Sequence, residues 1–232
     1  MKIVKKENIC IIPARGGSKR IPKKNMKYFF GKPIIYHVVE KIKKTNFFDK
    51  VVVSTESLEI AKYANKLGVN VHIRSKNLAK DSTKLKDVII NVINDYEKKN
   101  FYYKRVCCLF PTSIFFKTSE LKLGFKKLKK NINFIFTAKK YDHPIERSFK
   151  KKGNLLVMLN PKMERKNTQQ LVPYYHDAAQ FYLGWGNSWK LKRNIFQGKS
   201  DFVEIPKLNS QDIDNFDDWQ VAKTLWKLGN NK

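Results

Sequence analysis

Short apolar runs alternate with amphipathic segments along the first 139 residues of the chain. The apolar runs suit buried strands and lie at 8–14, 49–55, 69–74, 104–110 and 133–140. Between them, the spacing of apolar residues predicts helices at 32–45, 56–68, 81–100 and 117–131. Strands that alternate with helices predict an α/β fold with a doubly wound, mostly parallel sheet, whose ligand loops follow the carboxyl ends of the strands.

The pattern changes between residues 141 and 175. The stretch "HPIERSFKKKGNLLVML" predicts a loop and a hairpin, after which strands return at 177–185 and 201–206 and a helix ends near Gly229. We therefore predict one domain over residues 1–232, in which residues 141–175 form a small insertion that acts as a lid or a dimer contact.

Length and composition narrow the class of protein. A chain of 232 residues with 42% hydrophobic content can bury a large core. The apolar core at 9–13 is too short for a signal peptide, and no stretch reaches the roughly 18 to 20 apolar residues of a membrane span. We expect a cytoplasmic protein with no membrane partner.

The three cysteines lie in apolar runs without metal-binding spacing, which predicts reduced core residues.

The net charge of +28, from 48 basic and 20 acidic residues, raises the question of a nucleic-acid partner. The cations are mostly lysines spread over predicted helix faces, as in "EKIKKT" and "LKLGFKKLKKN". We therefore interpret them as a basic surface and do not expect specific nucleic-acid binding. The alternative predicts affinity for DNA or RNA that falls steeply with salt.

The stretch "IIPARGGSKRIPKKN", residues 11–25, joins a predicted strand to a basic loop. Two adjacent glycines let backbone N–H groups approach an anion, while Arg15, Lys19 and Lys24 can neutralise a polyphosphate. Neither the GxxxxGK[ST] nor the GxGxxG motif is present. A basic surface turn would explain the lysines but not Arg-Gly-Gly-Ser directly after a strand, so we predict a nucleoside triphosphate site.

The stretch "QDID", residues 211–214, predicts a second site. In an extended backbone Asp212 and Asp214 point to the same side while Ile213 faces the core. Paired carboxylates suit Mg²⁺, which shares its remaining positions with water and phosphate. Alternatively, Asp214 could cap the helix that starts near Phe216.

Two further segments follow or form predicted strands. Regular alternation in "YHDAAQFYLGW" would give two faces: His176, Ala178, Gln180 and Tyr182 on one, and Asp177, Ala179 and Phe181 on the other. The residues alone leave open whether this strand binds a ligand. Hydroxyls in "LFPTS", residues 109–113, could bind a sugar or cap the next helix.

Together these segments resemble the acylneuraminate cytidylyltransferases, the CMP-sialic acid synthetase family. "IIPARGGSKRIPKKN", "VVVSTES", "LAKDST", "LFPTS", "HPIERSF", "YHDAAQFYLG" and "QDIDNFDDW" occur in the family's order, from about Ile9 to Leu228. "HPIERSF" and "YHDAAQFYLG" are most similar to the branch that activates pseudaminic acid. The sialic-acid branch often has Gln-Pro-Thr-Ser, whereas this chain has Phe110-Pro-Thr-Ser, which disfavours N-acetylneuraminate as substrate.

The resemblance implies roles for three groups of residues. It assigns CTP binding to Arg15, Gly16, Gly17, Ser18, Lys19, Lys24, Asn25, Asp81, Ser82 and Thr83. It assigns the sugar side of the cleft to Thr112, Ser113, His176, Asp177 and Gln180. It assigns Mg²⁺ binding to Asp212 and Asp214, and catalysis to this pair with Arg15 and Lys24.

The same resemblance implies a Rossmann-like nucleotidyltransferase fold, a Mg²⁺ cofactor and a homodimer in which the insertion crosses to the partner. The implied reaction transfers CMP from CTP to the anomeric hydroxyl of a nonulosonic acid, a nine-carbon keto sugar acid. Three alternatives stay open: the same reaction on N-acetylneuraminate, legionaminate or KDO, a CTP-binding protein without catalysis, and the nucleic-acid-binding protein considered above.

Overall fold

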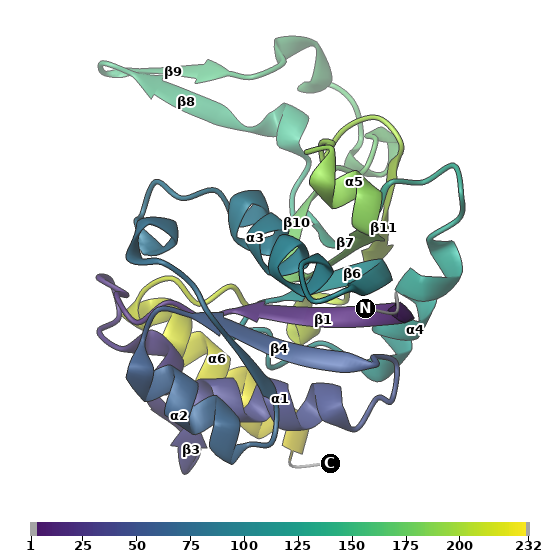
Figure 1. Cartoon of the computed structure of the whole chain (residues 1–232). Coiled ribbons are helices and arrows are strands. Elements are labelled where there is room, and N and C mark those ends of the chain that lie inside the picture. Colours follow the sequence, from purple (N-terminus) through teal and green to yellow (C-terminus); the bar gives the residue numbers. More distant parts are fainter. Residues whose placement is uncertain (1–3, 231–232) are drawn as a thin grey trace.

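The computed structural model describes residues 4–230 and places a seven-stranded sheet between two layers of helices (Figure 1). The strands of this sheet are β1 (Val4–Pro13), β4 (Lys50–Thr55), β5 (Asn70–Ile73), β6 (Phe101–Leu109), β7 (Phe134–Lys140), β10 (Tyr175–Trp185) and β11 (Ser200–Glu204). Their spatial order is β11-β7-β10-β6-β1-β4-β5, with β10 antiparallel to both of its neighbours and the other pairs parallel. The predicted α/β class with a mostly parallel sheet is confirmed.

The direction of β10 follows from where the inserted segment leaves and rejoins the sheet. β7 ends at Lys140 on the edge formed by the carboxyl ends of the parallel strands, and Tyr175, the first residue of β10, pairs with Lys140. Because the chain returns at the edge that it left, β10 must run back across the sheet in the opposite direction. The ligand-binding edge therefore carries the start of β10 beside the ends of β6 and β7.

Helices cover both faces of the sheet (Figure 1). The layer of α1 (Ile34–Lys43), α2 (Leu58–Lys66), α4 (Thr118–Lys127) and α6 (Phe216–Asn230) packs on one face, and α3 (Leu85–Glu97) and α5 (Gly186–Lys190) pack on the other. In β1, Cys10 and Ile12 belong to the first core cluster and Ile9 and Ile11 to the second, all with no exposed surface. Burial on both faces explains why this strand is continuously apolar.

The predicted hairpin is confirmed: β8 (Phe149–Lys152) pairs with β9 (Leu155–Met158), and this hairpin projects away from the body (Figure 1). Phe149, Leu155 and Leu156 on this arm are 65–71% exposed. The remaining short elements are β2 (Tyr28–Phe29), β3 (Lys32–Pro33), η1 (Lys24–Met26), η2 (Lys76–Ala79), η3 (Ile145–Arg147), η4 (Pro161–Met163), η5 (Thr168–Gln170) and η6 (Lys207–Asn209).

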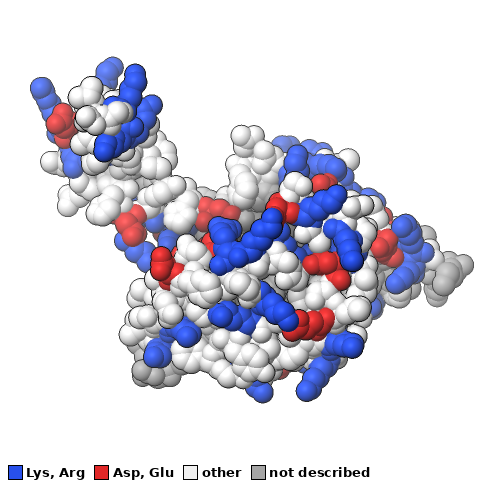
Figure 2. Space-filling model, turned by 90° about the vertical axis from the view of Figure 1, so that its left-hand side faces the viewer, with Lys and Arg blue, Asp and Glu red and all other residues white. Residues whose placement is uncertain are grey.

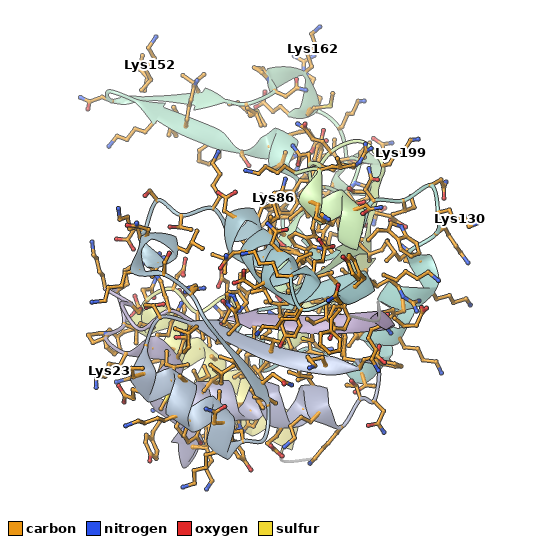
Figure 3. The ribbon with its side chains drawn as sticks, viewed as in Figure 1. Lys23, Lys86, Lys130, Lys152, Lys162 and Lys199 are labelled. Carbon is orange, nitrogen blue, oxygen red and sulfur yellow. The ribbon has the colours of Figure 1, made fainter. Side chains whose placement is uncertain are left out.

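The basic residues are spread over the surface. Lys23, Lys130, Lys152, Lys162 and Lys199 point outward at widely separated places (Figure 3). All three cysteines are buried and free, as predicted. None of the helices within residues 4–230 has the length and apolar character that crossing a membrane requires.

A hydrogen-bonded chain of Ser54, His72 and Asp95 ties the edge strand β5 to its neighbours. The Ser54 hydroxyl lies 3.1 Å from Nδ1 of His72, whose Nε2 lies 2.9 Å from a carboxylate oxygen of Asp95. The hydrogen bond from His72, with that from Lys98, lowers the pKa of Asp95. Ser, His and Asp form nucleophilic catalytic sites in other proteins. Here, however, Ser54 has no exposed surface and no substrate can reach it. The chain of contacts therefore has a structural role.

Gly186→Ala is expected to lower the free energy of unfolding by about 1–3 kcal/mol, because the added methyl overpacks a closed space. A Cβ at this position would lie 2.7 Å from the backbone oxygen of Tyr103. Gly229→Ala in α6 is the control, since its Cβ would have no neighbour within 4 Å and alanine favours helix. Urea unfolding midpoints measure both variants, and equal midpoints would contradict the packing argument.

Candidate active site

The basic loop after β1 lies on the edge of the sheet where the parallel strands end. There it borders a cavity of about 270 Å³ that also receives residues from the segment between β5 and α3 and from the end of β6. Arg15, Lys24, Asn25, Asp81, Thr83 and Thr112 line this cavity, which we call the nucleotide cavity. Figure 2 looks onto this edge and shows Lys and Arg side chains gathered around its centre, with carboxylates between them.

Arg15 and Lys19 hold one carboxylate between them. A guanidinium nitrogen of Arg15 pairs with one oxygen of Asp81, and Nζ of Lys19 lies 2.8 Å from the other. The hydrogen bond from Lys19, which has the larger effect, and that from Arg15 lower the pKa of Asp81, so its carboxylate stays ionised. Asn25 is buried and donates its side-chain N–H to the backbone oxygen of Arg15 at 2.8 Å, which braces the loop. Arg15 and Lys19, both predicted to contact phosphate, are thus paired with the carboxylate of Asp81.

The two glycines of the loop differ in their surroundings. The N–H of Gly16 already donates to Glu56 at 2.7 Å, and a Cβ there would lie 3.0 Å from Cβ of Ser57. Glycine at this position therefore permits close approach to the segment after β4. A Cβ on Gly17 would have no neighbour within 4 Å. The backbone N–H of Ser18 donates to the oxygen of Gly16 at 3.1 Å, which tightens the turn.

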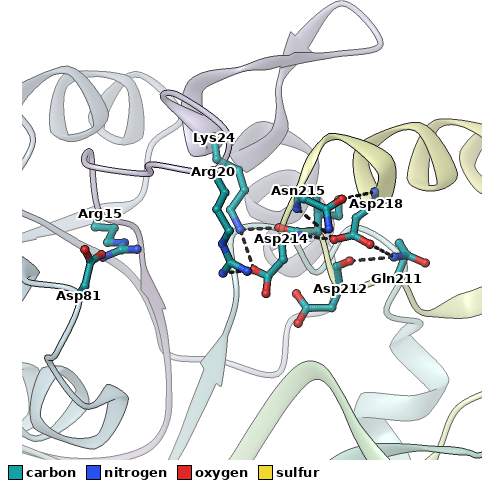
Figure 4. A network of polar contacts seen from close by, with 10 residues as sticks. Arg15, Arg20, Lys24, Asp81, Gln211, Asp212, Asp214, Asn215 and Asp218 are labelled. Carbon is teal, nitrogen blue, oxygen red and sulfur yellow. Dashed lines mark hydrogen bonds and ion pairs between the residues drawn. The ribbon is translucent and has the colours of Figure 1, made fainter. Parts of the chain in front are cut away.

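The predicted acid pair lies opposite the basic loop (Figure 4). Ile213 is fully buried and the carboxylates of Asp212 and Asp214 turn to the same side, as expected of an extended segment. Asp214 lies 2.9 Å from a guanidinium nitrogen of Arg20 and 3.6 Å from Nζ of Lys24. Lys24 also donates to the backbone oxygen of Ile213. Arg20, which the sequence alone does not separate from ordinary surface cations, thus belongs to the site.

The alternative role of Asp214 as a helix cap is wrong. Asn215 accepts a hydrogen bond from the N–H of Asp218 at 2.9 Å, and Asp218 accepts in return from the N–H of Asn215 at 3.0 Å (Figure 4). This reciprocal pair caps α6. Asp218 also accepts from the N–H of Asp214 at 2.9 Å. The capping bonds leave the carboxylate of Asp214 turned toward the cations.

Burial and like charge perturb the ionisable groups of this site. Desolvation, followed by the negative charge of Asp214, raises the pKa of Asp212. Desolvation lowers the pKa of Lys24, although Asp214 and Asp212 oppose that effect. Perturbed groups that converge in a cleft are typical of functional sites.

A bulge in β10 shapes the predicted sugar side. The pairing register with β7 shifts between Asp177 and Tyr182, and Ala179 takes a φ of +48°, which is rare for a residue with a Cβ. The hydroxyl of Tyr182 donates to a carboxylate oxygen of Asp177, whose other oxygen accepts from the N–H of Ala179 at 2.9 Å. The predicted alternation, which put Asp177 and Tyr182 on opposite faces, is wrong because the bulge adds residues to one strand.

The other predicted sugar residues lie around this bulge. Ser113 is fully buried and donates to the backbone oxygen of Gln180 at 2.7 Å, so its hydroxyl supports the bulge. Gln180 is 1% exposed, and its side-chain oxygen has no hydrogen-bond partner. Thr112 faces the nucleotide cavity and His176 stays half-buried. Of the CTP residues, Thr83 lines the nucleotide cavity, whereas Ser82 lines a neighbouring cavity of about 470 Å³.

Residues 9–215 match the model of a protein family described as cytidylyltransferase. The chain belongs to the cytidylyltransferase family. Within it, the sequence is 37% identical over 225 residues to pseudaminic acid cytidylyltransferase from Campylobacter jejuni, covering 96% of this chain and 97% of that one. It is 29% identical to CMP-N,N'-diacetyllegionaminic acid synthase from Legionella pneumophila, covering 95% and 96%. The family predicted from the motifs is confirmed.

The fold of this chain also resembles solved structures of cytidylyltransferases. The structure of CMP:2-keto-3-deoxy-manno-octonic acid synthetase complexed with CTP matches with a TM-score of 0.70 at 13% identity. The match covers 97% of this chain and all of the other. At that identity the likeness supports the nucleotidyltransferase fold alone.

In this cytidylyltransferase, Asp212 and Asp214 are the side chains that fit a magnesium ion. Among residues 4–230, no group of three or more His, Cys, Asp or Glu side chains could hold a metal. Two carboxylates on one side of an extended segment suit Mg²⁺, because this ion keeps several waters and takes phosphate oxygens as further ligands. Desolvation, and after it the negative charge of Asp214, raises the pKa of Asp212, and a bound cation would relieve the repulsion between the two carboxylates.

Sequence reasoning missed two residues, Arg74 and Glu56. Arg74 follows β5, is 6% exposed and lines the nucleotide cavity. One guanidinium nitrogen lies 3.2 Å from Glu56, and its other two side-chain nitrogens are buried without partners. Glu56 therefore links Arg74 to the N–H of Gly16. The available signal was a charged residue at the end of a predicted strand, at the edge of the sheet where ligand loops gather.

Proposed function

We propose that this enzyme transfers CMP from CTP to the anomeric hydroxyl of a nonulosonic acid, with pseudaminic acid as the preferred substrate, and releases pyrophosphate. The observation that carries the proposal is the position of the acid pair, Asp212 and Asp214, against Lys24 and Arg20 of the basic loop. The similarity to pseudaminic acid cytidylyltransferase supports the choice of sugar. Cations for a triphosphate and carboxylates for a metal thus lie side by side.

In this proposal the cations of the basic loop leave their carboxylate partners and pair with the triphosphate. Asp81 is 51% exposed and engages Arg15 and Lys19 where phosphate oxygens would bind. A triphosphate carries more charge than one carboxylate and can take both cations from Asp81. Lys24 and Arg20 likewise turn from Asp214 toward phosphate.

The chemistry is an in-line displacement at the α-phosphorus. The anomeric oxygen forms a bond to phosphorus while the bond to the pyrophosphate oxygen breaks, and the hydroxyl proton passes to a carboxylate or to solvent. Arg15 and Lys24 stabilise the charge that develops on the α-phosphate and the leaving group.

Asp212 and Asp214 would hold Mg²⁺, which supplies charge neutralisation to phosphate and favours the deprotonated sugar oxygen. The chain's own residues place these carboxylates: burial of Ile213 turns both outward, and Asn215 with Asp218 sets the start of α6. We further propose a cytoplasmic homodimer. The apolar side chains on the projecting hairpin support a contact with a second copy.

Pyrophosphate release with CTP, Mg²⁺ and a panel of sugar acids tests the proposal. We expect turnover with pseudaminic acid that exceeds turnover with N,N'-diacetyllegionaminic acid, N-acetylneuraminic acid and KDO, and none without Mg²⁺. Absence of turnover with every sugar, although CTP binds, would favour a binding protein without catalysis. Salt-sensitive binding of DNA without any turnover would favour the nucleic-acid alternative.

Asp81→Asn is expected to strengthen the binding of inorganic tripolyphosphate about two- to fivefold, because the carboxylate competes with phosphate for Arg15 and Lys19. Isothermal titration without sugar or metal measures the affinity. Asp201→Asn is the control, since Asp201 pairs with Lys127 at 2.9 Å at the start of β11. Equal or weaker binding by Asp81→Asn would contradict the exchange of partners.

A further inference from the structure

A cavity of about 530 Å³ lies at the edge of the sheet opposite the nucleotide cavity. Three segments form it: the first half of β6, the loop between α4 and β7, and the end of β10 with the residues that follow it. We call it the distal cavity. The residues on which its chemistry depends are Lys104, Lys130, Asn133, Trp185, Asn187 and Arg193. Cavities of this size are typical of sites for small molecules.

Strand β6 runs from the distal cavity to the nucleotide cavity. Lys104, in the first half of this strand, lines the distal cavity, and Phe110, which follows its last residue, lines the nucleotide cavity. At about 3.3 Å per residue, these two positions are roughly 20 Å apart. A ligand bound in the distal cavity would therefore lie outside the active site.

The charged residues of the distal cavity are all cations. Lys104, Lys130 and Arg193 line it, and none of its lining residues is acidic. Lys104 lies 3.6 Å from Glu7, but the side chains of Lys130 and Arg193 form no hydrogen bond or ion pair with any residue that the structure describes. An anion that enters the distal cavity thus meets two cations without having to displace an acidic side chain.

Two side-chain amides add hydrogen-bonding capacity to the distal cavity. The oxygen of the Asn133 amide accepts a hydrogen bond at 3.4 Å from the hydroxyl of Ser188, which is 5% exposed. The amide nitrogen of Asn133 donates to none of the described residues. Asn187 is exposed, and within the described part of the chain its side chain has no partner either. Both amides are therefore available to the hydroxyl groups of a ligand.

Two aromatic rings complete the distal cavity. The indole N–H of Trp185 donates to the backbone oxygen of Ile132 at 2.8 Å, while the residue stays partly exposed. The ring of Tyr103, which also lines the cavity, packs edge to face on Tyr96, with centroids 5.8 Å apart. These contacts hold the two rings in place. The C–H groups of a sugar ring gain from contact with such an apolar surface.

We propose that the distal cavity is a second ligand site, which binds a small sugar derivative that carries a phosphate or a carboxylate. Lys130 and Arg193 bind the anionic group. Asn133 and Asn187 bind hydroxyl groups of the sugar, and the indole of Trp185 packs against its C–H groups. The site is separate from the active site, so this inference does not depend on which sugar the enzyme activates.

A small ligand is a better occupant of the distal cavity than a nucleic acid or an acidic segment of a protein. The cations, amides and rings converge on one hollow from three separate segments of the chain. A nucleic acid would need cations in a row along its phosphates, whereas the outward lysines of this protein lie at widely separated places (Figure 3). An acidic peptide would not need two amides and an indole between the cations. Both occupants are outcomes of the test.

Glucose 6-phosphate and glucuronic acid are the probes, because they share a sugar ring and differ in the anionic group, and glucose is the neutral reference. The measured signal is the indole N–H resonance of Trp185, one of four tryptophans, in the magnetic resonance spectrum of isotope-labelled protein. Trp185→Phe assigns this resonance. Its shift during a titration gives the dissociation constant in the distal cavity, whereas a ligand that binds only in the nucleotide cavity leaves it in place.

Lys130→Gln combined with Arg193→Gln removes both unpaired cations. It keeps the backbone oxygen of Arg193, which accepts a hydrogen bond from Nζ of Lys86 at 2.6 Å. Lys122→Gln combined with Lys126→Gln is the matched control. The change in net charge is the same, and both of these lysines are exposed on α4 and do not line the distal cavity.

We expect at least one probe to shift the Trp185 resonance and to bind about tenfold or more tightly than glucose. The double substitution of Lys130 and Arg193 should weaken that binding about tenfold or more, whereas the control pair should change it less than about twofold. The probe with the higher affinity identifies the anionic group. A Trp185 resonance that neither probe moves would overturn the proposal. So would equal losses in the two double variants, or a shift that only a hexaglutamate peptide or a DNA duplex produces.

Discussion

Asp212→Asn is expected to lower kcat/KM about 10²–10³-fold while raising the melting temperature of the protein. The activity falls because one of the two carboxylates that can hold Mg²⁺ becomes neutral. The stability rises slightly because the ionised carboxyl of Asp212 is partly desolvated and faces the charge of Asp214 in the folded state, but Asp212 is an exposed residue, so solvent screens much of this effect. An amide keeps the shape of the side chain and removes both penalties. We expect a gain below about 1 kcal/mol, which corresponds to at most roughly 2–4 °C in a chain of this size.

The sign of the pH dependence follows from the direction of the pKa shift. The pKa of Asp212 is raised in the folded state, so folding favours the protonated form. The free energy of unfolding therefore falls as the pH rises from the pKa of Asp212 in the unfolded chain to its higher pKa in the folded protein. Above that range it stays at the lower value. The gain in Asp212→Asn should be larger at pH 7 than at pH 4.

Thermal unfolding with a metal chelator present measures these differences, since bound Mg²⁺ would mask them. Asp217→Asn is the matched control, an exposed carboxylate in the first turn of α6. It should keep full activity and gain no stability, because a negative charge near a helix N-terminus is favourable. Loss of stability in Asp212→Asn at both pH values, or activity close to that of the wild type, would contradict the proposed role.

Lys24→Met is expected to lower kcat/KM about 10²–10³-fold, whereas Lys23→Met should change it less than about twofold. The two lysines are adjacent in sequence but differ in surroundings. Lys24 has 20% of its side chain exposed and lies 3.6 Å from Asp214, so its ammonium faces the acid pair. Lys23 is 71% exposed and pairs with Glu59 at 3.0 Å, outside the nucleotide cavity.

Steady-state kinetics of pyrophosphate release compare the two variants with the wild type. Lys24 also donates to the backbone oxygen of Ile213, so a far-ultraviolet spectrum and a melting curve must show that Lys24→Met is folded. Desolvation already penalises this ammonium, as the lowered pKa indicates, and a methionine fits the site without that penalty. Equal losses in both variants would mean that general surface charge, rather than the position of Lys24, drives catalysis.

Much of the fold could be predicted because its signals are local. Apolar runs buried on both faces, such as Ile9 to Ile12 in β1, need no long-range information to be recognised as strands. The basic loop was likewise visible because it followed a predicted strand. The acid pair was visible because two aspartates flank an apolar residue in a predicted extended segment. Arg74 was missed because a single charged residue after a strand carries no pattern of its own.

The amino-acid sequence by itself determined the alternation of strands and helices, the hairpin between residues 141 and 175, and the residue types that meet at the ligand-binding edge of the sheet. Only the tertiary structure decided which of them pair. It paired Asp81 with Arg15, paired Arg20 with Asp214, and made β10 antiparallel to its neighbours. It also introduced the bulge at Ala179 that brings Asp177 to Tyr182. The reason is physical. The spacing of apolar residues and the capping of helices depend on neighbours in the chain. Strand order, pairing register and ion pairs depend on segments that lie tens of residues apart.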